Sequence, residues 1–280
     1  MGGRVEAFQT GQFESINYID CNSLYPYSIS NMKYPNLKTE RKTFAPKKER
    51  WKEIINKIGI SRTVIQNKND EIGCIPIRTK DNTYFIKVGQ IAIGTYTHIE
   101  LKEAMKNGYE IKDIEWSVTW EEMENPFKEI MQETYKKRKE GKAFNKYFYK
   151  TMMNSAIGKM AQRKAQQEIK IDTVELAEEY LKKNYQIIKG IDLNYMYKKD
   201  LDNKTKPYYM PIIPCLTNAY ARIYMYKIFK KMKKEDLIYT DTDSIIFKNW
   251  NKYKELFEFG GEMGEFKIEQ KNQKGIIYGK

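Results

Sequence analysis

Apolar and polar positions alternate in several ways along the chain, and each pattern predicts an element. Residues 16–29 alternate as a strand that we expect to break at Pro26. Residues 71–96 combine turn signals with β-branched residues, which indicates a small sheet or hairpin. The highly charged segment 38–68 has helical spacing around residues 50–59. The first third of the chain therefore predicts strands with one helix among them.

Several helices are predicted after residue 96. Thr97, with Glu100 three residues later, forms a capping-box pattern for a helix that ends near Asn107. Pro126 opens a basic helix that ends at Gly141. Further helices are expected over residues 143–164, 174–183 and 215–232. The two basic helices on either side of Gly141 indicate an antiparallel helical hairpin.

One apolar stretch, IYTDTDSII at residues 238–246, contains two aspartates where a buried strand is expected. Asp241 and Asp243 are two residues apart, so on an extended strand both side chains point to the same face. A buried carboxylate is unfavourable unless it is paired or binds a metal. Asp20 ends another apolar stretch. If the two strands are neighbours, three carboxylates meet at one edge of a sheet.

Three carboxylates at one edge suit hard divalent cations, with Mg²⁺ favoured. Two such ions, about 3.5–4 Å apart, can activate a 3′-hydroxyl and stabilise a leaving pyrophosphate. The chain has a single histidine, His98, so this chemistry would depend on carboxylates. Solvated aspartates in turns are the alternative for an isolated D-x-D pair.

The charge balance indicates a polyanionic partner. Lysine and arginine number 50 against 37 acidic residues, a net charge of +13, and there are 22 tyrosines. This composition suits nucleic-acid backbone contacts with base stacking, while an anionic membrane surface or a lysine-rich solubilising surface fits the charge as well.

The three cysteines, Cys21, Cys74 and Cys215, are widely scattered, which disfavours a zinc site or a disulfide framework. No run of 18 apolar residues and no signal peptide is recognisable.

Four basic residues of the predicted hairpin recur at steps of four: Arg138, Lys142, Lys146 and Lys150. This spacing places them on one helical face if the second helix starts soon after the first. A row of cations there could hold a triphosphate, and an ordinary solvated basic face is the alternative. Lys150 is the hardest of the four to explain as solvated, because apolar residues follow it.

Three short motifs together resemble a known family. The stretches DCNSLYP (20–26), KTMMNSAIG (150–158) and YTDTDS (239–244) resemble motifs A, B and C of the family B DNA polymerases, in the same order. GGRVEAF (2–8) is similar to the glycine motif that joins the exonuclease and polymerase parts of that family. PIIPCLTNAYAR (211–222) is similar to the start of the helix before motif C. The motifs are spread over nearly the whole chain, and their order argues against chance.

The resemblance implies an α+β fold, with an antiparallel palm sheet covered by helices on one face and a helical-hairpin fingers subdomain. The long gaps between motifs have room for the two insertions of the protein-primed subgroup, which copies linear phage and plasmid genomes. The implied organisation is palm with motif A (1–32), a first insertion (33–96), palm (97–125), fingers with motif B (126–163), a linker with a second insertion (164–210), and palm with motif C that stops before the thumb (211–280).

The resemblance also implies roles for individual residues. Asp20, Asp241 and Asp243 would be catalytic metal ligands, joined by the backbone carbonyl of Cys21, with two Mg²⁺ ions as cofactor and Mn²⁺ as a substitute. Lys150 would neutralise the triphosphate and protonate the departing pyrophosphate. The implied nucleotide-binding residues are Ser23, Leu24, Tyr25, Arg138, Lys146, Lys150, Asn154 and Gly158, among which Tyr25 would exclude a 2′-hydroxyl. The implied DNA-binding residues are Gly2, Gly3, Tyr239 and Thr242.

The chain departs from the family pattern in three places. Ile157 stands where the family usually has tyrosine, which puts fidelity and sugar selection in doubt. No exonuclease motif has a place before the glycine motif, so we expect no proofreading. The chain ends where the family's K-x-Y motif should start, so we expect no thumb. A split gene, a shortened chain and one module of a larger assembly all fit this pattern.

The predicted function is that of a template-directed DNA polymerase core that adds deoxynucleotides to a primer 3′-hydroxyl. The expected partners are primer-template DNA and deoxynucleoside triphosphates, with no membrane. A terminal-protein primer and separate exonuclease or thumb subunits are further candidates. The expected location is the cytoplasm or the host-cell compartment of a phage, virus or linear plasmid. The alternative function is a nucleic-acid-binding subunit or remnant that is active only with a partner. A reverse transcriptase is disfavoured because its adjacent paired aspartates are absent.

Overall fold

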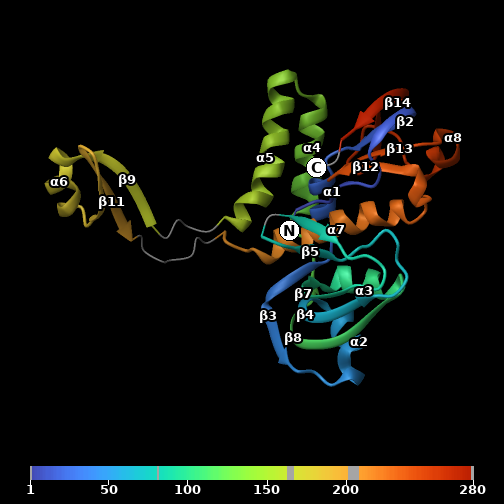
Figure 1. Cartoon of the computed structure of the whole chain (residues 1–280), viewed down its shortest axis with the longest axis horizontal. Coiled ribbons are helices and arrows are strands. Elements are labelled where there is room, and N and C mark those ends of the chain that lie inside the picture. Colours follow the sequence, from blue (N-terminus) through green and yellow to red (C-terminus); the bar gives the residue numbers. More distant parts are fainter. Residues whose placement is uncertain (1, 81, 163–166, 201–207, 279–280) are drawn as a thin grey trace. The chain divides into compact units, whose positions relative to one another are not determined.

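The chain has an α+β fold with antiparallel sheets, as expected (Figure 1). The computed structural model describes residues 2–80, 82–162, 167–200 and 208–278. Its residues fall into two compact units. The first consists of Met1–Ile157 with Ile212–Lys280, and the second consists of Gly158–Pro211.

Five antiparallel strands form the sheet that carries the candidate catalytic residues. Their order across the sheet is β1 (Val5–Ala7), β12 (Leu237–Asp241), β13 (Ser244–Phe247), β2 (Gly11–Cys21) and β14 (Phe266–Ile277). The central strands β12 and β13 contribute the buried side chains Ile238, Ile245 and Phe247 to the core. Because β1 and β2 come from the start of the chain and β12 to β14 from its end, the sheet forms only when both ends meet.

The helix α7 (Ile212–Phe229) packs against α1 (Leu24–Asn31), and the helix predicted for residues 215–232 is thus present. The strand predicted from residue 16 up to a break at Pro26 ends earlier, because β2 ends at Cys21 and α1 begins three residues later. Pro26 lies in the first turn of α1, where a backbone N–H has no intrahelical acceptor, so its ring is tolerated. No helix among the described residues has the length and apolarity needed to cross a bilayer.

A second antiparallel sheet packs against the helices α2 (Trp51–Asn56) and α3 (His98–Lys106). The order of its strands is β3 (Tyr34–Phe44), β8 (Tyr109–Met123), β4 (Ile58–Asn67) and β7 (Ile91–Thr97). The expected hairpin within residues 71–96 is formed by β5 (Pro76–Arg78) and β6 (Thr83–Phe85). The predicted cap of α3 is confirmed, since the Glu100 N–H donates to Thr97 Oγ1 at 3.3 Å and the Thr97 N–H donates to Glu100 Oε2 at 3.1 Å.

The helical prediction for residues 38–68 holds only for a short part of the segment. The 3₁₀ turn η1 (Lys48–Arg50) and the six-residue α2 are helical, and most of the rest belongs to β3 and β4. The strand β3 is an edge of the sheet, and its charged side chains are exposed. Charges on an edge strand oppose pairing with another chain, and they obscure the alternation that would have predicted a strand.

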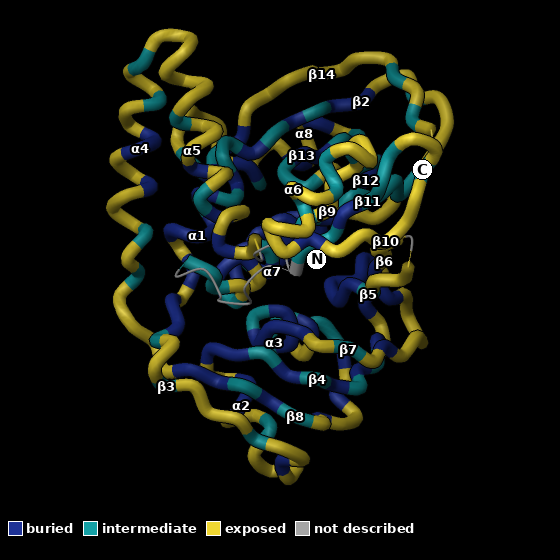
Figure 2. Tube along the Cα trace, turned by 90° about the vertical axis from the view of Figure 1, so that its left-hand side faces the viewer, coloured by how far each residue is buried: buried dark blue, intermediate teal, exposed yellow. Residues whose placement is uncertain are grey.

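The predicted helical hairpin consists of α4 (Lys128–Glu140) and α5 (Ala143–Ala161), which lie side by side (Figure 1). Met131 and Tyr135 of α4, and Met153 and Ile157 of α5, are buried. The first half of α5 is almost entirely exposed (Figure 2). The hairpin is therefore anchored at one end and surrounded by solvent at the other.

Short helical elements complete the first unit near the end of the chain. They are η3 (Lys234–Asp236), α8 (Trp250–Tyr253) and η4 (Lys254–Leu256). Trp250 and Phe257 pack their rings against Phe247 of the central sheet, with ring centroids 6.1 and 5.4 Å apart. This aromatic contact attaches the short elements to β13.

The second unit is built around a three-stranded antiparallel sheet. Its strand order is β10 (Gln186–Ile191), β11 (Asn194–Asp200) and β9 (Gln167–Thr173). The helix predicted for residues 174–183 is present as η2 (Val174–Leu176) followed by α6 (Ala177–Lys182). Tyr180 of α6 packs on Tyr185 and Tyr197, with ring centroids 5.1 and 4.4 Å apart. The predicted linker and second insertion, 164–210, lie partly outside the described residues.

Candidate active site

Asp241 and Asp243 lie at a tight hairpin turn. The strand β12 ends at Asp241, β13 begins at Ser244, and these two residues pair across the turn. Thr242 has a φ of 58°, in the left-handed region that β-branched residues rarely adopt. Its N–H donates to the Arg4 carbonyl oxygen at 2.7 Å. The prediction that both aspartates lie on one extended strand is therefore wrong, because a two-residue turn interrupts the strand.

Gly3 supports this turn because it has no side chain. A Cβ at Gly3 would lie 2.6 Å from Thr242 Cγ2 and 2.8 Å from Thr242 Cβ. The neighbouring Gly2 carbonyl accepts a hydrogen bond from Arg222 Nη1 at 2.6 Å, and Arg222 is also paired with the buried Glu100 at 2.7 Å. The sequence pattern gave no signal for these contacts of the two glycines.

Asp20 is brought to the same edge of the sheet by strand register. The strand β13 lies between β12 and β2, and Asp20 is the partner of Ser244. The Cys21 N–H donates to the Asp243 carbonyl oxygen at 2.8 Å, and the Cys21 thiol lies 3.4 Å from the Gly264 carbonyl oxygen. Backbone hydrogen bonds thus hold the end of β2 against the turn.

The three carboxylates affect one another electrostatically. Burial, together with the nearby charges of Asp20 and Asp241, raises the pKa of Asp243 to about 6, and Lys150 opposes this rise. Burial and the charge of Glu269 raise the pKa of Asp20, while Lys267 and Lys150 oppose it. The edge therefore accumulates negative charge, and Lys150 of α5 is the hairpin cation that partly compensates for it.

The donor atoms at this edge suit a hard cation. Carboxylate oxygens of Asp20 and Asp243 are the ligand type that Mg²⁺ prefers, and a cation would relieve their mutual repulsion. No group of three or more histidine, cysteine, aspartate or glutamate side chains within the described ranges is arranged to hold a metal ion. The chemistry of the donors fits a divalent ion, but their arrangement is not that of a preformed three-ligand site.

Arg138, a cationic residue of α4, contacts the residue that precedes α1. Arg138 Nη1 donates to Ser23 Oγ at 2.5 Å. Ser23 precedes α1 and has a φ of 51°, and its side chain does not cap the helix. The first N–H groups of a helix have no intrahelical acceptors and attract anions. Arg138 and the start of α1 therefore form a small electropositive region, which includes the N–H groups of Leu24 and Tyr25.

Two further contacts dock α4 onto the turn that precedes β14. The Tyr135 hydroxyl donates to the Gly261 carbonyl oxygen at 2.7 Å, and Lys139 forms an ion pair with Glu262. Both residues flank Arg138 on the helix, and its guanidinium lies 5.5 Å from the centre of the Tyr135 ring. These contacts were not predicted, because only the fold brings residues so far apart in sequence together.

Tyr25 connects α1 to the N-terminal segment. Burial raises the pKa of its phenol, which also forms a hydrogen bond with the backbone of Gly3 and lies within electrostatic range of Arg222, Asp243 and Asp241. The side chain thus lies beside the aspartate turn.

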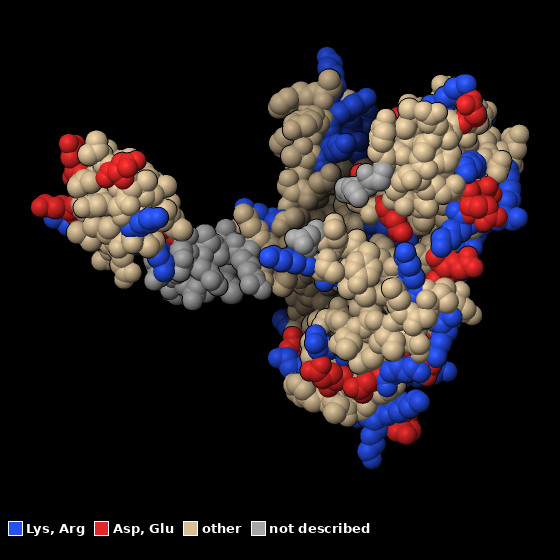
Figure 3. Space-filling view, viewed as in Figure 1, with Lys and Arg blue, Asp and Glu red and all other residues tan. Residues whose placement is uncertain are grey.

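The other predicted site residues have fewer contacts that tie them to the aspartate turn. Leu24 is buried in the core, and Tyr239 on β12 is partly buried near Asp241. Three residues of α5 are exposed: Lys146, Asn154 and Gly158. No hydrogen bond or ion pair joins the Lys146 or Asn154 side chain to another described residue. Figure 3 shows lysine and arginine side chains gathered on one side of the α4–α5 hairpin.

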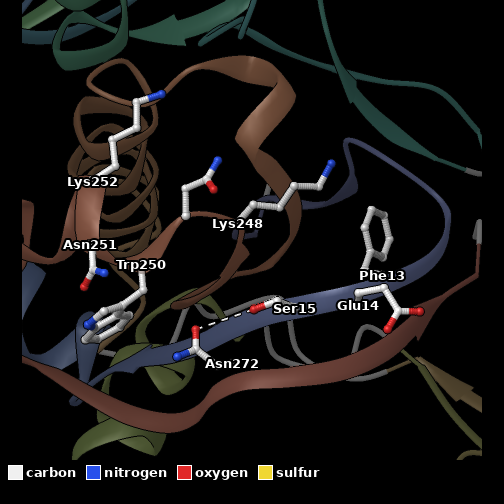
Figure 4. Close-up of a pocket in the computed structure, with 9 residues that line it drawn as sticks. Phe13, Glu14, Ser15, Lys248, Trp250, Asn251, Lys252 and Asn272 are labelled. Carbon is white, nitrogen blue, oxygen red and sulfur yellow. Dashed lines mark hydrogen bonds between the residues drawn. The ribbon is translucent and has the colours of Figure 1, made fainter.

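A separate cleft lies at the other end of β2 (Figure 4). Its volume is about 600 Å³, and its walls include Phe13, Lys248 and Trp250. Ser15 on β2 donates to Asn272 on β14 at 3.5 Å across its floor. Phe13 is seven residues before Asp20, about 23 Å along an extended strand. The cleft is therefore not part of the aspartate edge.

Comparison with known proteins finds DNA polymerases. The family described as "DNA polymerase type B, organellar and viral" matches residues 1–235. A protein of Podospora anserina described as a probable DNA polymerase is 26% identical over an alignment of 307 residues, which covers 99% of this chain and 25% of that protein.

Two solved structures of phi29 DNA polymerase share the fold. One is an orthorhombic crystal form, and the other is a ternary complex with primer-template DNA and incoming nucleotide substrates. Each has a TM-score of 0.72 to this chain, at 18% and 19% identity, and covers 98% of it. The chain spans 46% and 47% of those polymerase chains, and a quarter of the length of the fungal protein.

Proposed function

The chain belongs to the organellar and viral type B DNA polymerases, and we propose that it is the nucleotidyl-transfer core of such an enzyme. It joins a deoxynucleotide to a primer 3′-hydroxyl and releases pyrophosphate. The observation that carries the proposal is the turn from Asp241 to Ser244, held beside Asp20 at one sheet edge and within the electrostatic range of Lys150.

Asp20 and Asp243 would be the main groups that hold divalent ions, with Asp241 and the Cys21 carbonyl oxygen beside them. Two Mg²⁺ ions bound there would acidify the primer hydroxyl and neutralise the pyrophosphate. A cation at this edge favours the charged form of Asp243, whose pKa is otherwise raised. Mn²⁺ accepts the same oxygen donors and is the expected substitute.

The triphosphate binds at the start of α1. Ser23 and the N–H groups of Leu24 and Tyr25 lie where helix amides lack partners, and Arg138 is already anchored there. Lys150 neutralises the triphosphate and donates a proton to the departing pyrophosphate. The Tyr25 ring lies under the sugar and excludes a 2′-hydroxyl. The remaining contacts to the nucleotide come from the exposed face of α5, at Lys146, Asn154 and Gly158.

Primer-template DNA and deoxynucleoside triphosphates are the proposed partners. Support comes from the net charge of +13 and from the phi29 polymerase structure that was solved with primer-template DNA and incoming nucleotides. Gly2, Gly3, Tyr239 and Thr242 are the proposed contacts to the DNA. A terminal-protein primer and separate exonuclease or thumb subunits remain proposed partners of the larger enzyme.

The proposed organisation assigns the five-stranded sheet with α1 and α7 to the palm, and the α4–α5 hairpin to the fingers. Three strands of the four-stranded sheet, β3, β4 and β7, fall essentially within the proposed first insertion (33–96), whereas β8 falls in the proposed palm segment 97–125. The second unit contains the proposed linker and second insertion (164–210). Limited proteolysis tests these boundaries, since cleavage between subdomains should precede cleavage within them.

Primer extension tests the proposed function. Excess protein, a primed DNA template, deoxynucleotides and Mg²⁺ are incubated with the wild type, with Asp241→Asn, and with Asp113→Asn as a matched control. Asp113 is exposed on β8, away from the turn. We expect extension by the wild type and the control, and none by Asp241→Asn. Intact DNA binding without extension by any of the three would favour a binding subunit that depends on a partner.

A further inference from the structure

The first turns of α5 carry three large aromatic side chains that the fold leaves in solvent. Phe144 is 77% exposed, Tyr147 is 71% exposed and Phe148 is 50% exposed. Single exposed apolar residues are common on protein surfaces, but a group of large ones marks an interaction site. These three residues are here called the aromatic row.

The two phenylalanines of the aromatic row are arranged as a stacking platform. Phe144 and Phe148 are one helical turn apart, their ring planes are 19° from parallel, and their centroids are 6.5 Å apart. Bases along a nucleic-acid strand stack about 3.4 Å apart, so a single base inserted between two rings needs about twice that spacing. The centroid distance is close to this value, and the nearly parallel exposed rings each offer a face on which a base can stack.

The surroundings of the aromatic row are strongly basic. Residues 128–150, from the start of α4 to Lys150, contain eight lysines and arginines against three glutamates, a net charge of +5. With 3.6 residues per turn, Tyr147 lies between the two phenylalanines and Lys146 around the helix. A strand crossing the helix can therefore place its bases on the rings and its phosphates toward Lys142 and Lys146.

The combination of aromatic rings with lysines distinguishes between possible occupants of the surface. The centre of a protein–protein interface is depleted of lysine. Proteins that bind single strands combine a basic surface with aromatic rings on which bases stack. The charge of +5 is complementary to phosphates, and the rings are complementary to unpaired bases.

We propose that the aromatic row binds unpaired bases of single-stranded DNA, as the uncopied template strand. The assignment rests on the proposed function, because it gives the polymerase core a contact to its template beyond the base pair being formed. It adds to the fingers an outer surface that shares Lys146 with the proposed nucleotide contacts.

The test is the titration of a fluorescently labelled oligo-dT strand with the protein at several salt concentrations. The triple variant Phe144→Ala, Tyr147→Ala, Phe148→Ala should bind at least tenfold more weakly. Its slope of log affinity against log salt should be unchanged, because stacking releases no counterions. The variant Lys142→Ala, Lys146→Ala should instead reduce that slope by about 1.4, since each phosphate contact to a single strand contributes about 0.7.

Two further variants test whether a loss of affinity depends on the position and on the ring faces of the aromatic row. Phe44→Ala removes a phenylalanine that is 74% exposed at the end of β3, and it should leave the affinity unchanged. Replacing all three members of the aromatic row by leucine keeps apolar area but removes the ring faces, and it should weaken binding as the alanine variant does.

Wild-type affinity in the alanine variant, or full affinity in the leucine variant, would overturn the proposal. Self-association of the wild type that the alanine variant abolishes, without a loss of DNA affinity, would assign the surface to a second copy of the chain. The titration measures DNA binding and does not depend on catalysis, so Asp241→Asn should bind oligo-dT with wild-type affinity. Loss of extension in Asp241→Asn with intact binding separates the two proposals.

Discussion

The aspartate turn and the α4–α5 hairpin place charged groups for the same proposed reaction in opposite ways. The turn lies between buried strands, and its backbone donates a hydrogen bond to the Arg4 carbonyl oxygen and accepts one from the Cys21 N–H. The hairpin is anchored at its base, while the first half of α5 is exposed. Like charges can be held close together only where a rigid scaffold opposes their repulsion. Cations that must reach a ligand can be carried by a helix in solvent.

The two regions also differ in backbone strain. Thr242 adopts a left-handed conformation within the turn, which costs on the order of 1–3 kcal/mol for a residue of this kind. The described part of α5 has regular helical geometry and no residue with a positive φ. Of these two regions, only the turn that fixes the carboxylates contains a residue with a strained backbone, which suggests the predictions that follow.

Gly3→Ala should have the largest effect on the turn. The new Cβ would overlap the Thr242 side chain, including its Cβ, which cannot move without the backbone. A displacement of about 1 Å at a reacting centre costs on the order of a hundredfold in rate. We therefore expect primer extension to fall about a hundredfold, measured by single-turnover kinetics.

Gly190→Ala is the control for this prediction, since a Cβ at Gly190 would lie no closer than 3.6 Å to neighbouring atoms. Thr242→Gly should restore activity to Gly3→Ala by removing the overlapping side chain. Equal loss of activity in both alanine variants would show that the turn is not the cause.

The docking of α4 should affect nucleotide binding more moderately. Lys139→Glu or Glu262→Lys breaks their ion pair and loosens the segment that carries Arg138. An exposed pair contributes at most about 1 kcal/mol, so KM for deoxynucleotides should rise up to about fivefold with little change in kcat. The double charge reversal should restore KM.

Lys136→Glu makes the same change of charge on α4 at a residue without an ion pair in the described structure. It should leave KM closer to the wild-type value. Failure of the double reversal to improve on either single variant would argue that the pair does not position Arg138.

The stability of the metal-free protein should depend on pH through Asp243. Its pKa of about 6 in the folded state exceeds the unfolded value of about 3.9, so the folded state binds the proton more tightly. The stabilising contribution of this group is complete below pH 4 and is lost as pH rises through 6. Asp243→Asn should therefore melt like the wild type at pH 4 and several degrees higher at pH 7, in thermal unfolding with a chelator.

A melting difference that is the same at both pH values would mean that Asp243 titrates normally. Added Mg²⁺ should reduce the difference at pH 7 by stabilising the wild type selectively, because the bound ion requires the charged carboxylate.

Thr242→Gly should have the smallest effect. Glycine adopts positive φ without steric cost, but it also gains more freedom in the unfolded chain. The net change should be a stabilisation of less than about 1 kcal/mol, or roughly 2–4 °C in Tm. A clear destabilisation would show that the packing of Thr242 on Gly3 contributes more than its strained backbone costs.

Several features of the protein were determined by local sequence. The capping box at Thr97 and Glu100 and the hairpin around Gly141 depend on residues a few positions apart, and they form as predicted. The carboxylates and cations of the site were recognised as residue types in short motifs. Such signals are readable because the groups that interact are close in the chain.

Other features were decided only by the tertiary structure. The turn at Thr242 contradicts local preference, and it exists because Gly3 and Arg4 contact it from the other end of the chain. The charged segment 38–68 became mostly strand because the sheet supplied partners for its backbone. Contacts across more than a hundred residues, such as Arg138 with Ser23, depend on how elements pack, and local periodicity carries no information about them.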